Sequence, residues 1–214
     1  MKNYSVVVWR LVLILLMVVL PQAAFAQSGS EDDGEYIPLV FGDNVFSMLY
    51  PSAWIFNEEL QDSLNFASDD ALFDISTGSA FEAGDVRVSL SLIPSAEAYD
   101  PETPLLTTFA QVISDTLLEQ FDGEFPPTLF PSLPEILPGS EDTNEVARLI
   151  LDFGETAEGR MYFWQLTDHV YGLMNVTSAV GEMADHEPAV LIMIASSTLT
   201  IDYTIESLAA GSGQ

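Results

Sequence analysis

The alternation of apolar and polar positions predicts a β-hairpin near the start of the folded region. Two apolar runs, YIPLVF and VFSMLYP, flank Gly42-Asp43-Asn44, which is typical of a hairpin with a short glycine-containing loop. Pro38 favours an edge position for the first strand, because proline has no N–H to donate within a sheet. Asp85–Ile93 alternates most strictly, and its pattern predicts a strand with one buried face.

Further strands are expected on both sides of this one. Two brief strands are predicted around Leu64–Phe66 and Leu72–Ile75. Three more form a predicted meander whose strands are apolar on both faces, so the sheet is expected to be covered on both sides. The meander strands are Glu145–Phe153, Arg160–Thr167 and Val170–Thr177, with turns at Glu155–Gly159 and Asp168–His169.

Two segments have the pattern of helices. The first begins with Thr103 as N-cap and Pro104 as first helical residue and runs to about Phe121, with its apolar residues at helical spacing. The second begins at Asp185, or at Glu187 just before Pro188, and it is apolar almost all round between Val190 and Leu199. That composition is typical of a well-buried helix.

The segment between the first helix and the meander is rich in proline. Residues 124–138 (EFPPTLFPSLPEILP) contain five prolines, which exclude a regular helix or a central strand. The segment is too apolar for an ordinary solvated loop. The favoured interpretation is that it folds back over the core; the alternatives are an apolar surface for a partner and a polyproline ligand.

Taken together, these elements predict an α+β fold. We expect an antiparallel β-sheet of about six strands covered by helices on both faces, an α/β/α sandwich, in a single globular domain over residues 36–206. Residues 27–35 (QSGSEDDGE) have the composition of a flexible acidic linker, and residues 207–214 that of a flexible tail.

Residues 1–26 have the pattern of a secretory signal peptide. Lys2 and Arg10 supply positive charge, Leu11–Leu20 is an unbroken apolar run, and Ala24-Phe25-Ala26 is a small-residue cleavage site. The apolar run is too short to span a bilayer, so cleavage between Ala26 and Gln27 is favoured over a retained anchor. The sequence thus predicts a secreted, periplasmic or otherwise extracytoplasmic protein.

Charge is the most unusual quantity of the chain. Without Lys2 and Arg10, three basic residues (Arg87, Arg148 and Arg160) face 33 acidic ones, a formal charge of −30. Such a chain cannot neutralise a row of phosphates, so nucleic-acid binding and attraction to an anionic membrane are excluded. The acidity favours a soluble monomer outside the cell or adaptation to a saline medium, and it leaves capture of cations or of a basic partner open. No stable membrane insertion is expected once the signal is cleaved.

The search for reactive groups assigns no catalytic residue, no cofactor and no cofactor-binding residue. Cysteine is absent, no serine stands in a G-x-S-x-G motif, and His169 and His186 form no paired ligand spacing. Metal binding stays undecided, because three carboxylate clusters could contribute oxygens to Ca²⁺ although none has the EF-hand spacing. These clusters are Glu58-Glu59 with Asp62, Asp69-Asp70 with Asp74, and Glu141-Asp142 with Glu145.

The stretch FSMLYPSAW (residues 46–54) enters the motif Y-P-x-x-W and resembles the opening "aromatic-Pro-x-x-Trp" of the PsbP-like superfamily. The order of elements after it is similar as well, and Ser196-Ser197-Thr198-Leu199 resembles the final "S-S-F" stretch of that family. The resemblance covers most of residues 36–203. It implies an antiparallel sheet between helical layers, generally without enzymatic activity, and it supplies no catalytic residue. Tyr50, Pro51 and Trp54 are expected to be structural.

The sequence therefore favours a non-enzymatic exported binding or accessory domain that engages a protein or an envelope component. A cation-binding module that uses surface carboxylates is the first alternative. A carboxylate-dependent hydrolase is the second, with Tyr162 and Trp164 near Asp152 or Asp168 as its candidate groove.

Overall fold

The computed structural model describes residues 36–41, 45–57, 63–74, 81–95, 100, 102–120, 130–137 and 145–200, and the following concerns this part of the chain. The predicted signal peptide, acidic linker and C-terminal tail lie outside the described residues. Within them, no helix combines the length and the apolar character that a membrane crossing requires.

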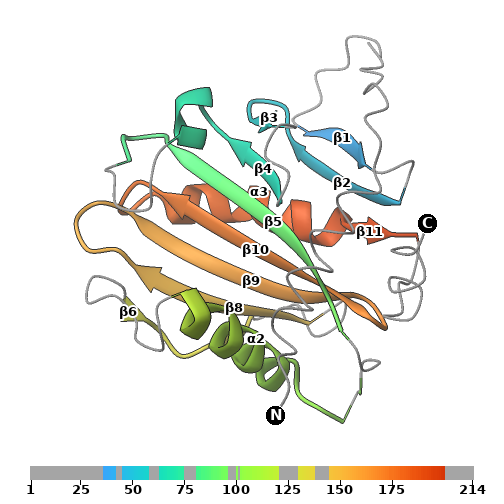
Figure 1. The fold of residues 1–214 in the computed structure, drawn as a ribbon. Helices are drawn as coiled ribbons and strands as arrows, with labels where there is room; N and C mark the ends of the chain where they lie inside the picture. Colours follow the sequence, from blue (N-terminus) through green and yellow to red (C-terminus); the bar gives the residue numbers. More distant parts are fainter. Residues whose placement is uncertain are drawn as a thin grey trace.

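The described strands form two antiparallel sheets (Figure 1). The larger sheet has the order β3-β4-β5-β10-β9-β8-β6, with β7 also paired to β8, and the smaller has the order β1-β2-β11. The larger one contains β3 (Ile55–Asn57), β4 (Leu64–Ala67), β5 (Val86–Pro94), β6 (Phe130–Pro131), β7 (Glu135–Ile136), β8 (Val146–Asp152), β9 (Glu158–Thr167) and β10 (Val170–Ser178). The smaller contains β1 (Tyr36–Phe41), β2 (Phe46–Pro51) and β11 (Thr198–Leu199), and the helices are η1 (Asp70–Asp74, 3₁₀), α2 (Leu105–Gln120) and α3 (Met183–Ser196).

One sheet of about six strands was expected, and the described residues form eight-stranded and three-stranded sheets instead. The hairpin β1–β2 has the predicted bounds, but it pairs with β11 rather than with the larger sheet. The second helix ends at Ser196, not at Leu199, because Thr198 and Leu199 add a short strand to β2. Such a pairing depends on where α3 delivers the chain, which local periodicity cannot show.

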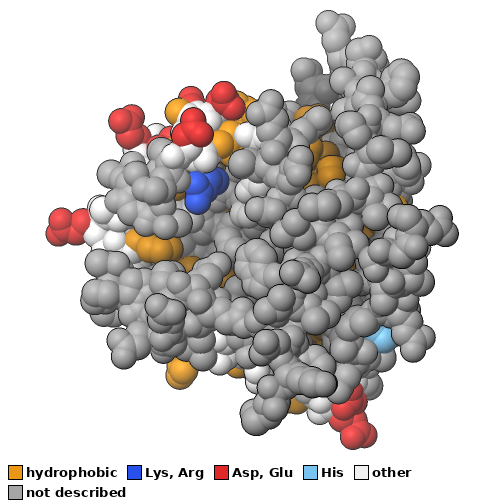
Figure 2. Space-filling model, in the orientation of Figure 1, with side chains coloured by type: hydrophobic (Ala, Val, Ile, Leu, Met, Phe, Trp, Pro, Cys, Tyr) orange, Lys and Arg blue, Asp and Glu red, His pale blue; other side chains and the backbone are white. Residues whose placement is uncertain are grey.

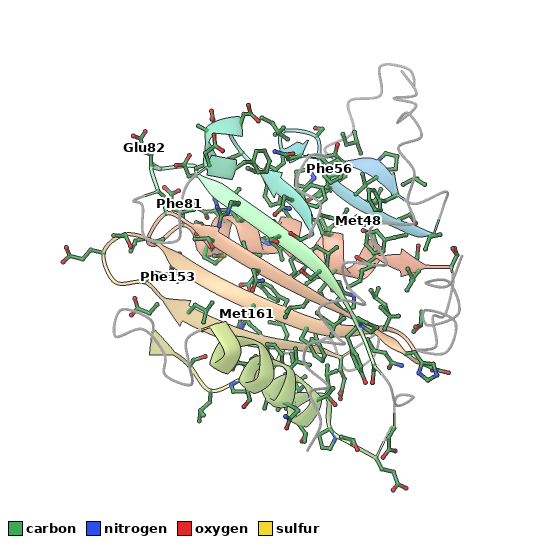
Figure 3. The ribbon with its side chains drawn as sticks, in the orientation of Figure 1. Met48, Phe56, Phe81, Glu82, Phe153 and Met161 are labelled. Atoms are coloured by element: carbon green, nitrogen blue, oxygen red, sulfur yellow. The ribbon has the colours of Figure 1, made fainter. Side chains whose placement is uncertain are left out.

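Two apolar clusters occupy alternate positions along the strands. Met161 lies beside α2 in Figure 3. The first cluster includes Leu39, Met48 and Trp54 with Val88, Leu90, Tyr162, Trp164 and Met174 from the larger sheet and Met183, Val190 and Met193 from α3. The second includes Leu105 and Phe109 from α2 with Leu149, Met161, Phe163, Tyr171 and Leu173.

Both helices begin at residues that differ from the prediction. The Pro104 carbonyl accepts the first bonds of α2, and the Thr103 hydroxyl donates to Asp100 instead of capping the helix. Helix α3 begins at Met183, so Pro188 lies inside it. The early start has a tertiary cause, because buried Met183 donates its backbone N–H to the Glu158 carboxylate at 2.6 Å.

The predicted strand at Leu72–Ile75 is wrong for its described part, which belongs to the 3₁₀ helix η1. The side chain of Asp69 accepts the Ala71 N–H at 2.9 Å, and its carbonyl accepts the Leu72 N–H. An aspartate that bonds the backbone two residues on initiates a turn, and this local bond outweighs the strand preference of the apolar residues.

The described part of the proline-rich segment lies at the edge of the larger sheet. Strands β6 and β7 pair with β8, in agreement with the exclusion of a central strand. Ile136 packs on the α2 cluster and Leu137 on the α3 cluster, whereas Leu133 is 89% exposed. The segment therefore covers the sheet edge and also displays one large apolar side chain.

Gly172 of β10 leaves room for the indole ring of buried Trp164 on the neighbouring strand. A Cβ at position 172 would lie 2.4 Å from the ring, well inside van der Waals contact. We predict that Gly172→Ala destabilises the protein by about 1–3 kcal/mol in urea denaturation, the usual cost of overpacking a core. Replacing Trp164 by Leu in the same variant should recover part of that loss, and purely additive effects of the two changes would contradict this explanation.

Candidate functional site

An ion-pair cluster joins α3 to the larger sheet. Glu187 Oε1 accepts hydrogen bonds from Arg148 Nη1 and from the Tyr162 hydroxyl, both at 2.8 Å, and its Oε2 pairs with Arg160. Arg148 also donates to Glu135 of β7. Arg148 and Tyr162 are register partners on β8 and β9, and Arg160 lies two residues from Tyr162 on the same face. The cluster therefore links α3, two strands and the proline-rich edge.

Burial and charge together set the protonation of this cluster. Burial alone would raise the pKa of Glu187, but hydrogen bonds from Arg160, Arg148 and Tyr162 outweigh it and hold the pKa below its usual value. Burial, with the charge of Glu187 nearby, raises the pKa of Tyr162. Glu187 is therefore ionised and Tyr162 neutral at neutral pH, so the cluster is a structural tie and not a poised acid–base pair.

All three arginines that follow the predicted signal make internal contacts. Arg148 and Arg160 meet at Glu187, and Arg87 Nη1 donates to the Leu72 carbonyl of η1 at 3.3 Å. Burial lowers the pKa of Arg87. The chain thus uses these cations to hold its own elements together, whereas most described carboxylates lie on the surface.

A second feature is a surface without charged residues, formed by β1, β2 and the chain from Pro188 to Thr200. These segments contain no Asp, Glu, Lys or Arg, although 18% of the whole chain is charged. Seven of their apolar side chains are exposed: Ile37, Pro38, Val40, Leu49, Pro188, Ile192 and Ala195. We call this surface the uncharged face.

The elements that form the uncharged face are in contact with one another. Helix α3 packs along β2, and the Ser196 hydroxyl accepts the Leu49 N–H at 2.9 Å. The inner sides of both elements belong to the same core cluster, so their outer sides face away from the larger sheet. In Figure 2, acidic side chains gather over η1.

The hydroxyl groups of this layer are bonded to one another and to its backbone. Ser47 and Thr198 share a hydrogen bond of 2.7 Å, and the Ser196 hydroxyl donates to the Ile192 carbonyl. A surface whose polar groups are already satisfied loses little when a partner excludes water from it. The layer is therefore chemically suited to contact with another apolar surface.

The residues singled out in the sequence are scattered in the structure. His186 packs its ring against Trp54, with centroids 6.4 Å apart, and His169 lies in the β9–β10 turn. Tyr162 and Trp164 are buried, so they do not line an open groove beside Asp152 or Asp168. Asp69, Asp70 and Asp74 lie on or beside η1, while Glu58, Glu59, Asp62, Glu141 and Asp142 fall outside the described residues. Among the described residues, no group of three or more His, Asp or Glu could hold a metal ion.

Sequence reasoning missed both the Glu187 cluster and the uncharged face. A usable signal existed for the first, because Arg148 and Arg160 stand in strands that are apolar on both faces, where a cation needs a carboxylate partner. For the second, the signal was the complete lack of charge in residues 188–200 of so acidic a chain.

No family model matches the chain, and no curated protein matches its sequence. Among solved structures, the chain is similar to the Ran-binding protein Mog1p of Saccharomyces cerevisiae, with 10% identity and a TM-score of 0.48 over 77% of this chain and 95% of that one. It is also similar to cyanobacterial PsbP from Synechocystis, with 12% identity and a TM-score of 0.49 over 83% and 99%. PsbP is the family that the motif around Trp54 resembles; a likeness at this level does not extend to partner or activity.

The Glu187 cluster leads to a prediction about pH. Because the pKa of Glu187 is lowered on folding, its stabilising contribution is complete above the ordinary glutamate value of about 4.5 and is lost as pH falls through the lower folded value. We predict that wild type is more stable than Glu187→Gln at pH 7 and that this difference shrinks below about pH 4.5. Denaturation of both proteins across that range measures it, and the repulsion among the other carboxylates cancels in the comparison. A difference independent of pH would contradict the ionised state of Glu187.

Proposed function

We propose that this chain is a non-enzymatic, exported accessory domain that binds another protein or an envelope component through its uncharged face. The observation that supports this proposal most is that β1, β2 and residues 188–200 contain no charged residue, although the chain has 33 acidic residues. Val40 is 54% exposed and Ile192 38% exposed at this surface. Exposed apolar area without charge is a usual property of the centre of a protein interface.

The apolar character of α3 supports the same proposal. A helix that is apolar almost all round is expected to be covered on all sides. In this chain, the side of α3 that carries Val190, Met193 and Ile194 is buried, whereas Pro188, Ile192 and Ala195 are exposed. A bound partner would supply the missing cover.

The proposal retains the other parts of the sequence interpretation. The segment 1–26 directs export and is removed between Ala26 and Gln27, after which the chain is a monomer kept in solution by its charge. The proposal also includes a sheet with helical layers on both faces. This arrangement is supported by the packing of α3 on one set of strand positions and of α2 on the alternate set. The Ran-binding activity in the name of Mog1p is compatible with a protein-binding role here and is not evidence for it.

Charge insertion tests the proposal with a matched control. Val40 and Val180 are both 54% exposed, but only Val40 lies on the uncharged face, since Val180 is in the turn before α3. We predict that Val40→Glu reduces the affinity for the natural partner more than about tenfold and that Val180→Glu does not weaken it, because a partner would have to desolvate the carboxylate at position 40.

The measurement is quantitative capture from the extracytoplasmic fraction of the source cells on immobilised wild type and both variants, followed by titration of the captured protein. Unchanged far-ultraviolet circular dichroism and melting temperature establish that the variants are folded. The same affinity for Val40→Glu and Val180→Glu would place the binding surface elsewhere.

A further inference from the structure

The charges around the uncharged face indicate what kind of partner it takes. Glu82, Glu182 and Asp185 lie together at the start of α3, where Glu182 accepts the Gly84 N–H at 2.6 Å. Glu82 and Asp185 are exposed. The uncharged surface of α3 thus begins beside carboxylates, and a partner that covers the face brings its rim close to them.

A second copy of this chain is a poor occupant. Without Lys2 and Arg10, each copy carries a formal charge of −30, and a symmetric pair would place identical acidic surfaces beside one another. Repulsion of this kind disfavours association unless salt screens it. Self-association through the uncharged face therefore conflicts with the charge of the chain.

Addition of a strand at the edge of the smaller sheet is also disfavoured. Strand β1 has β2 as its only neighbour in the described sheet, and Pro38 stands in the middle of β1. An incoming strand would need an N–H there, and proline has none. Binding through side chains of the face is more compatible with this sequence than binding through the backbone of its edge.

We propose that the partner is a protein whose contact surface is apolar at its centre and carries Lys or Arg at the rim that meets Glu82, Glu182 and Asp185. This inference rests on the proposed function and adds the chemistry of the partner. Apolar contact at Val40, Leu49 and Ile192 supplies affinity, while the opposite charges speed encounter and set the orientation.

The test uses three fluorescent helical peptides of equal length as probes. The first has leucine on one face and lysine on the other, the second replaces lysine by glutamate, and the third replaces leucine by serine. We expect saturable binding of the leucine–lysine peptide alone, measured by fluorescence anisotropy at about 0.15 M salt. Raising the salt to about 0.5 M should weaken this binding without abolishing it, since the apolar contact is not screened.

Neutral substitutions locate the binding site without changing the charge of the protein. Val40→Ser and Ile192→Ser should each weaken binding about fivefold to tenfold, whereas Val180→Ser, with the same exposure as Val40, should have no effect.

Removal of one charge tests the contribution of the acidic rim. Asp185→Asn should weaken binding about threefold, in the range of a surface ion pair. Circular dichroism again verifies folding.

The outcomes separate this inference from the proposed function. Equal binding of the lysine and glutamate peptides, or no saturable binding of any peptide, would overturn the basic-rim inference and leave a binding role of the face intact. Equal effects of Val40→Ser and Val180→Ser would mean diffuse attraction and overturn it too. A dimer that sedimentation detects in wild type and not in Val40→Ser would identify a second copy as the occupant and contradict the inference.

Discussion

The ion pairs at Glu187 are the interaction on which the arrangement of this molecule depends. Two of the three arginines that follow the predicted signal converge on this one carboxylate, and buried Tyr162 donates to it as well. Its side chain is only 20% exposed, so removal of the carboxylate would leave half-buried Arg160 without its ion-pair partner and half-buried Arg148 with Glu135 alone. The cluster fixes how α3 lies on β8 and β9, and through Arg148 it also fixes the proline-rich edge.

The position of α3 in turn creates the surface that we assign to binding. The helix leads directly into β11, which joins β2 and so sets the smaller sheet beside it. Helix α3 has no charged residue after Glu187. Repulsion among the many carboxylates favours their spread over the surface outside the uncharged face. In the proposed function, the acidity keeps the chain in solution, and the uncharged face is where another protein approaches without this repulsion.

Local pattern predicted the strands in which apolar and polar positions alternate. The strict alternation of β5 and the two apolar runs of the β1–β2 hairpin identified their strands with nearly correct bounds, because one buried face imposes a period of two. The start of α3 was missed, because Met183 is held by the Glu158 carboxylate on a distant part of the chain. Strands β3, β6 and β7, with two or three residues each, exist only through their pairing.

The candidate site was less predictable than the fold. The sequence marks Glu187 only as a possible helix start, because no residue near it in the sequence indicates that it pairs with Arg148 and Arg160. The lack of charge in residues 188–200 was visible, but it is equally typical of a helix buried on all sides. Only the exposure of Ile192 and Pro188 in the folded chain distinguishes an uncharged surface from a fully buried helix.

Native-state hydrogen exchange of the α3 amides tests most directly whether Glu187 holds the layer in place. Loss of a partly buried partner is expected to cost about 2–3 kcal/mol, between the values for exposed and for buried ion pairs. Glu187→Gln should therefore speed exchange in α3 about 30- to 150-fold at neutral pH, with α2 much less affected. Replacing Glu187, Arg148 and Arg160 together by apolar residues of similar size should restore most of the protection, and Asp185→Asn should have little effect. Equal exchange of α3 in wild type and Glu187→Gln, or faster exchange in the triple variant than in Glu187→Gln, would contradict the account.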